Sequence, residues 1–203
     1  SKNYTVVPVV VNITLQPKRE VPDISVSMDN WTYGENAKTP RYDVIAGVEA
    51  TVTYAAQGSS DFSTTVPTNA GSYTVKVQYE TAIEIHTGTA NFTIAPKTLT
   101  KDDLIHSGPI TKVYDGSTNA PSGLTVSVKH DSLVGSDTLA VSGTLKYNSA
   151  NVNEAKQIIF TPTAITTGNY ALAATEVLTI TEAAITKAKQ APLTVTSTDA
   201  TYG

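Results

Sequence analysis

The chain has 203 residues, a net charge of −4, 16% charged residues and no cysteine. The low charge excludes a basic surface for nucleic-acid phosphates, and the lack of cysteine excludes disulfides, thiolate metal sites and cysteine nucleophiles. The length suits two small modules better than one large domain, and the plentiful threonine, valine and tyrosine are typical of strands.

Alternation of apolar and polar residues predicts antiparallel strands along most of the chain. In "VEATVTY" the side chains of positions 48, 50, 52 and 54 face one side, and in "SYTVKVQY" those of positions 73, 75, 77 and 79 do the same. Shorter strands are expected at 24–28, 83–85, 90–94, 124–128, 139–147, 158–160 and 193–195. The best helical candidate is one short turn in 101–108, whereas 171–178 is expected to be strand because its counterpart in the repeat is one.

An internal repeat organises these strands. "WTYGE" at Trp31, "KVYDGST" at Lys112 and "ATYG" at the end of the chain recur at intervals of about 80 to 90 residues, a spacing typical of small all-β modules. The expected division is a tail of a preceding module at 1–18, modules at 19–97 and 98–189, and the first strand of a following module at 190–203. We expect two tandem antiparallel Ig-like β-sandwiches in an elongated arrangement, with β-grasp-like modules, in which a helix crosses the sheet, as the alternative.

The recurring residues are predicted to be structural. The rings of Tyr33 and Tyr114 are expected to pack on the module cores, and Tyr114→Ala is expected to cost about 3 kcal/mol or more. Gly34 and Gly116 are expected to supply backbone turns that a side chain would hinder. The remaining motif positions are Gly71, Tyr73, Asp115, Asn169 and Tyr170.

At these residues the sequence resembles two repeat families of bacterial surface proteins. The first module, with "NWTYGENAKTP" and "TVPTNAGSYTVKV", resembles the MBG repeat of the Tyr-Gly type. The second, with "KVYDGST" and "TTGNYALAATEVLTITEAAITK", resembles the YDG repeat. The resemblance implies an extracellular, cell-surface or cell-wall location in a bacterium and adhesin-like tandem architecture, more securely than it implies a ligand.

Catalytic and metal sites are not expected. His86, His106 and His130 lack partner motifs and are interpreted as solvated surface residues, and no cofactor is predicted. Calcium bound near Asp103 at the module junction is kept as a minor alternative. A second minor alternative is an intramolecular isopeptide bond, for which we nominate Lys112, Asn169 and Glu176.

Two functions remain open from the sequence. The first is a non-enzymatic stalk or spacer in a surface or secreted protein, a monomer whose partners are neighbouring repeat modules and, weakly, a host glycan or extracellular protein. The second is a carbohydrate-binding module that presents an aromatic platform of Trp31, Tyr33, Tyr42 and Tyr54, although an aromatic residue placed before a turn, as Trp31 is, more often caps the core. Nucleic-acid binding and membrane insertion of these residues are not expected.

Overall fold

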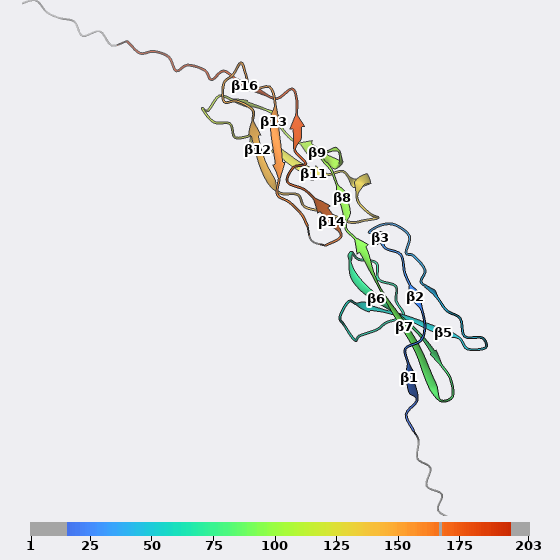
Figure 1. Ribbon diagram of the computed structural model, residues 1–203. Helices are drawn as coiled ribbons and strands as arrows, with labels where there is room; N and C mark the ends of the chain where they lie inside the picture. The colour runs from blue at the N-terminus through green and yellow to red at the C-terminus, as the bar shows by residue number, and fades with distance from the viewer. Residues whose placement is uncertain (1–15, 167, 196–203) are drawn as a thin grey trace, which may run out of the picture. The chain divides into compact units, whose positions relative to one another are not determined.

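The computed structural model describes residues 16–166 and 168–195. The chain divides into two compact units, one ending at Ala95 and one beginning at Pro96 (Figure 1). The described residues are strands, turns and loops, and their only helical elements are the single 3-10 turns Lys101–Asp103 and His130–Ser132. The fold is therefore all-β, and within the described ranges no helix crosses a sheet as the β-grasp alternative requires. Most of the expected tail at 1–18, and the last eight residues of the expected strand at 190–203, lie outside these ranges.

The first unit is built on one five-stranded sheet. Its strands are β1 (Arg19–Val21), β3 (Trp31–Thr32), β5 (Ala50–Ala56), β6 (Gly71–Glu80) and β7 (Glu84–Ala95). The long β6–β7 hairpin forms its centre, and β5 lies antiparallel against β6 (Figure 1). Both β1 and β3 pair in parallel with β7, at its beginning and at its end. A separate antiparallel pair joins β2 (Val26–Ser27) to β4 (Arg41–Tyr42).

The core of the first unit follows from the predicted alternation. Along β6, Val75, Val77 and Tyr79 are buried, whereas the intervening side chains of Lys76 and Gln78 are only half-buried. Phe92 of β7 lies at the centre of an aromatic cluster. The rings of Trp31 and Tyr73 stack on that of Phe92 with centroid distances of 5.1 and 5.6 Å, and Tyr54 meets it edge-on at 6.2 Å. One face of the sheet thus buries the aromatic side chains.

The segment between β1 and β3 runs along the edge of β7 that is opposite β6. Pro22 cannot donate a backbone hydrogen bond, and after it the N–H of Ile24 donates to the carbonyl of Thr87 at 3.1 Å. A Cβ atom on Gly88 would collide with the carbonyl oxygen of Ile24. Glycine at position 88 therefore lets the two backbones come this close.

The second unit consists of several short ladders. Its strands are β8 (Lys97–Leu99), β9 (Leu104–Ser107), β10 (Thr111–Val113), β11 (Thr125–Val128), β12 (Gly143–Tyr147), β13 (Ile158–Pro162), β14 (Tyr170–Leu172), β15 (Leu178–Ile180) and β16 (Ala184–Thr186). Antiparallel pairing joins β9 to β11 and builds the sheet β12–β13–β15. Parallel pairing joins β8 to β14 and β10 to β16. Figure 1 shows these two parallel ladders at opposite ends of the unit.

Tyr147 is the aromatic residue of the main core cluster of the second unit. It is 3% exposed and lies in a cluster with Ile158, Ile180 and Ile185, which come from three different strands. Its phenol oxygen lies 2.9 Å from the carbonyl oxygen of Ile110 and 3.1 Å from that of Ala184. The ring therefore fills the core while its hydroxyl group joins the segment before β10 to β16.

Several predicted strands are wrong in part. The expected strand at 24–28 is limited to β2, and 171–178 is not a continuous strand, because residues 173–177 form the connection between β14 and β15. Residues 139–142 are not strand, because the partner strand β13 ends at Pro162, opposite Gly143, and only one further backbone bond, from Thr163 to Ser142, continues the pairing. Residues 193–195 are not strand either, since no neighbouring strand is present among the described residues. Leu193 and Val195 are accordingly 82% and 79% exposed.

Candidate functional site

The Tyr-Gly element of the first unit follows β3. The Tyr33 N–H donates to the carbonyl of Ala95 at 2.8 Å, which extends the parallel pairing of β3 with β7 by one residue. Gly34 has a φ of +89°, a conformation that favours glycine. The ring of Tyr33 is half-buried and packs against the aromatic cluster. The expected roles of Tyr33 and Gly34 agree with this geometry.

The Tyr-Asp-Gly element of the second unit occupies the equivalent place after β10. The Tyr114 N–H donates to the carbonyl of Thr186 at 2.8 Å, just beyond the parallel pairing of β10 with β16. Gly116 has a φ of +77°. Both elements therefore follow a strand that pairs in parallel with the last strand of its unit, which the sequence repeat alone could not establish.

Asp115 closes the second element through three hydrogen bonds. Its carboxylate accepts from the ammonium group of Lys112 at 2.7 Å, from the Ser117 N–H at 2.9 Å and from the Ser117 hydroxyl at 3.0 Å. The Lys112 side chain is only 11% exposed, and its ammonium nitrogen lies 5.6 Å from the centroid of the Tyr147 ring. The aspartate thus partners a cation that reaches into the edge of the core.

This arrangement changes the acidity of Asp115. The hydrogen bond from Lys112, followed by that from the Ser117 N–H, lowers the pKa of the Asp115 carboxyl from 3.8 to about 2. The pKa in the folded state is below the unfolded value, so these bonds stabilise the fold fully above about pH 4. Their contribution is lost as the pH falls from about 4 towards 2.

The expectation that the Tyr114 ring packs on the core is wrong. The side chain is 46% exposed, and the adjacent Val113 is 59% exposed. Alternation along β10 turns Lys112 inward, so its neighbour Val113 faces out, and the tight turn that follows keeps Tyr114 at the surface. Tyr147 of β12 occupies the core position instead.

The proposed aromatic platform is also not formed. Trp31 and Tyr54 are 5% and 8% exposed, because both rings pack against Phe92. Tyr42 is half-buried and meets Tyr79 edge-on, with 6.4 Å between ring centroids. Tyr33 is likewise engaged with the core, so the four rings do not present a common exposed face.

An open pocket of about 170 Å³ lies instead where β5 ends and β6 begins. Tyr54 and Tyr73 line it from these strands, and Asp61, Thr65 and Pro67 line it from the connecting loop. The Tyr73 hydroxyl donates to the carbonyl of Asn69 at 2.9 Å, which fixes the ring. Gly71 opens β6 beside this ring, where a Cβ would lie 3.1 Å from the Tyr73 hydroxyl oxygen. The sequence indicated Tyr54 and Tyr73 but gave no signal for Asp61.

The histidines have different environments. His106 and His130 are exposed, as expected. His86 is not a solvated residue: its side chain is 17% exposed, with Nδ1 2.9 Å from an Asp23 carboxylate oxygen and Nε2 3.3 Å from one of Glu84. The sequence predicted a solvated surface position for His86, but the segment carrying Asp23 covers this edge of β7.

The described ranges contain no group of three histidine or acidic side chains that could hold a metal ion, and no helix long and apolar enough to cross a membrane. At the expected junction, the Asp103 carboxylate accepts hydrogen bonds at 2.7 Å from the Thr100 N–H and from the Ser132 hydroxyl. These bonds stabilise the 3-10 turn at Lys101–Asp103, so the Asp103 carboxylate has a structural role in this turn.

Comparison with known protein families bears on the second unit. A family model described as the YDG domain matches residues 95–179, a span that contains the Tyr-Asp-Gly element and Tyr147 and covers less than half of the chain. Residues 95–179 form a YDG domain. The match ends within β15, so β16, the parallel partner of β10, follows it. Searches of curated proteins and of solved structures found no match to the chain.

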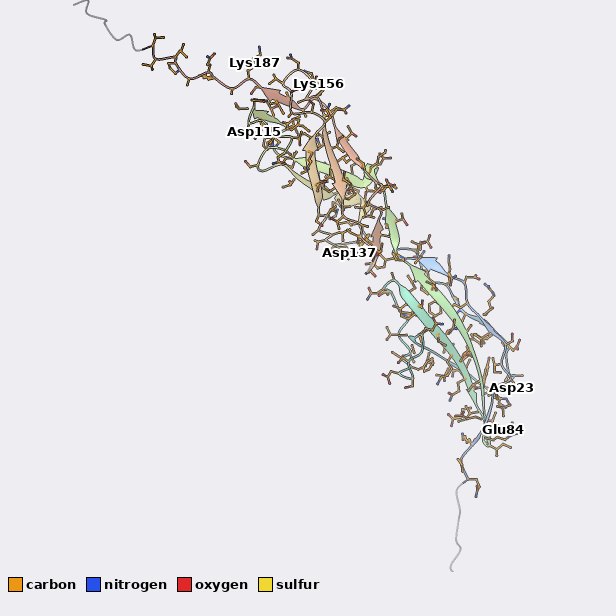
Figure 2. All side chains as sticks on the ribbon, turned by 60° about the vertical axis from the view of Figure 1, so that its left-hand side comes forward. Asp23, Glu84, Asp115, Asp137, Lys156 and Lys187 are labelled. Atoms are coloured by element: carbon orange, nitrogen blue, oxygen red, sulfur yellow. The ribbon has the colours of Figure 1, made fainter. Side chains whose placement is uncertain are left out.

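The closing motif of the YDG domain lies at the other end of the unit from Asp115. The Asn169 carbonyl accepts from the Lys97 N–H at 2.9 Å. Tyr170 is buried, and its hydroxyl donates to Asp137 at 2.7 Å while accepting from the Val134 N–H at 2.8 Å. Figure 2 shows Asp115 and Asp137 at opposite ends of the second unit.

This separation argues against the nominated isopeptide bond in the YDG domain. Lys112 is bonded to Asp115, whereas Asn169 lies beside β8. Glu176 accepts from the Lys101 N–H at 2.8 Å. The hydrogen bonds of the three residues therefore lead to different parts of the unit, and the fold does not gather them into one reactive group.

Proposed function

We propose that residues 19–189 are two consecutive Ig-like β modules, an MBG-like module followed by the YDG domain, in a bacterial surface or secreted protein. They act as a non-enzymatic stalk or spacer, and their main partners are neighbouring repeat modules of the same chain. The supporting observation is the equivalent hydrogen bonding of the two motif tyrosines, from Tyr33 to Ala95 and from Tyr114 to Thr186. A tandem repeat is expected to place the same backbone hydrogen bond, from the motif tyrosine to the last strand, in each of its units.

An antibody raised against residues 96–195 tests the location of the parent protein. It is expected to label intact, unpermeabilised cells of the source bacterium or to detect the protein in the culture medium. Labelling that appears only after permeabilisation, with none in the medium, would contradict the proposal. An antibody against a cytoplasmic protein provides the control for cell integrity.

A glycan-binding role is the second candidate, and the pocket beside Tyr54 and Tyr73 favours it. Drug-sized ligands fill pockets of roughly 300 to 1,000 Å³, so a pocket of about 170 Å³ suits one sugar ring. The tyrosine rings offer apolar contact, and the exposed Asp61 carboxylate can accept hydrogen bonds from two neighbouring sugar hydroxyls.

Titration of the full chain with methyl glycosides of galactose and N-acetylgalactosamine, followed by NMR, tests this second role. The expected result is saturable shifts of the Ala55 and Ala56 amide signals that are lost in Asp61→Asn. The matched control is Asp131→Asn, which changes an exposed carboxylate of the other unit and should keep the shifts. The absence of saturable shifts in the unaltered chain would leave only the spacer role.

A further inference from the structure

All parallel ladders among the described residues involve the first or the last strand of a unit. In the first unit, β1 and β3 pair with the last strand, β7. In the second, the first strand, β8, pairs with β14, and the last strand, β16, pairs with β10. The ladders between the remaining strands are antiparallel. Parallel pairing is therefore confined to ladders that hold the first or the last strand of a unit, although β7 also pairs antiparallel with β6.

We propose that these ladders are mechanical clamps, which make each unit resist tension applied through the chain. In a parallel pair, pulling the start of one strand away from the end of the other slides the strands past each other. The hydrogen bonds of the ladder then carry the load together. An antiparallel hairpin pulled at its open end loses its bonds one after another instead. This inference rests on the spacer role, since a spacer between a cell and a bound ligand transmits tension.

Side chains reinforce the clamp where the chain enters the first unit. The Lys18 ammonium contacts a Glu80 carboxylate oxygen at 2.7 Å, and the Arg19 guanidinium is bonded to the Glu84 carboxylate. Asp23, just beyond β1, contacts His86 of β7. Figure 2 shows Asp23 and Glu84 close together at this end of the sheet. Exposed ion pairs add little to equilibrium stability, but the Arg19–Glu84 pair lies across β1 and β7, the two strands that tension would slide apart. The Lys18–Glu80 pair joins the chain just before β1 to the end of β6.

The second unit carries a comparable reinforcement at its last strand. The Thr186 hydroxyl donates to the Lys112 carbonyl at 3.2 Å, and the Tyr114 N–H donates to the Thr186 carbonyl. The buried Tyr147 hydroxyl lies within hydrogen-bonding distance of carbonyls on both sides, those of Ile110 and Ala184. Sliding of β16 along β10 would disrupt these contacts together with the ladder.

Single-molecule force spectroscopy on the full chain tests the direction of loading. The chain has no cysteine, so attachment points can be set freely. One sample is pulled through its two termini, and the other through Ser72→Cys and Thr93→Cys. These exposed positions are paired at the open end of the β6–β7 hairpin, so this pull unzips the sheet. At one loading rate, the terminal pull is expected to need at least about twice the force of the unzipping pull.

A pair of variants tests the clamp in the first unit. Arg19→Ala is expected to lower the unfolding force of that unit, which is recognised by the length of chain released. Arg41→Ala is the matched control, because it removes a comparably exposed ion pair, Arg41–Asp29. This pair does not bridge β1 and β7, so its loss should leave the unfolding force unchanged. Equal forces for the two pulling directions, or equal loss of force in both variants, would overturn the inference. Neither result bears on where the protein is located, which antibody labelling decides separately.

Discussion

Phe92→Ala is expected to destabilise the first unit by about 3 to 5 kcal/mol, the range for truncating a buried aromatic side chain. Phe92 is 2% exposed, and three other rings pack against it. Its removal would create a cavity at the centre of the cluster, which the rigid strands β6 and β7 could fill only in part. Trp31 is the only tryptophan and stacks on Phe92, so urea unfolding followed by its fluorescence reports on this unit alone.

Phe62→Ala is the matched control for this first prediction. Phe62 is only half-buried, and its ring contacts the Lys76 ammonium at 4.4 Å from the centroid, outside the aromatic cluster. The expected loss is about 1 kcal/mol. Similar losses for the two variants would show that the cluster is not the centre of stability.

Tyr147→Ala is expected to cost the second unit about 3 to 5 kcal/mol. The change removes a buried ring and also leaves the carbonyls of Ile110 and Ala184 without the phenol. Tyr147→Phe keeps the ring and should cost about 1 to 3 kcal/mol, the penalty for leaving a buried hydrogen-bonding group unsatisfied. Protection of the β13 amides in native-state hydrogen exchange measures both losses for this unit.

Tyr114→Ala provides the comparison within the same unit. Because its side chain is 46% exposed, its truncation is expected to cost less than about 1 kcal/mol, not the 3 kcal/mol predicted from the motif. A loss as large as that of Tyr147→Ala would mean that the Tyr114 ring packs in the core after all.

The sequence predicted strands best where one face is buried. Alternation identified β6, whose Val75, Val77 and Tyr79 form one buried face. It could not reveal which strands pair, because parallel pairing of β10 with β16 joins residues about 70 positions apart. The surface position of Tyr114 depends on that pairing, so the motif alone suggested the wrong side chain for the core.

The two motifs also differ for a reason that appears only in three dimensions. Trp31 and Lys112 occupy equivalent ladder positions, opposite Ile94 and Ile185, and both turn towards their cores. An indole in this position packs on Phe92, whereas an ammonium group requires an anionic partner. Asp115, the middle residue of the Tyr-Asp-Gly element, provides that partner. The aspartate of the motif is therefore explained by the lysine at this ladder position of the second unit, whose ammonium group it partners.

The dependence of β1 and β3 on β7 also affects how the protein is synthesised. The ribosome produces both early strands long before residues 84–95, so the edge they will occupy does not exist when they leave the exit tunnel. Contacts between such distant segments slow folding, and unpaired strands in incomplete chains favour aggregation. The first unit should therefore complete its fold only after Ala95 has emerged, while translation of the second unit is already under way.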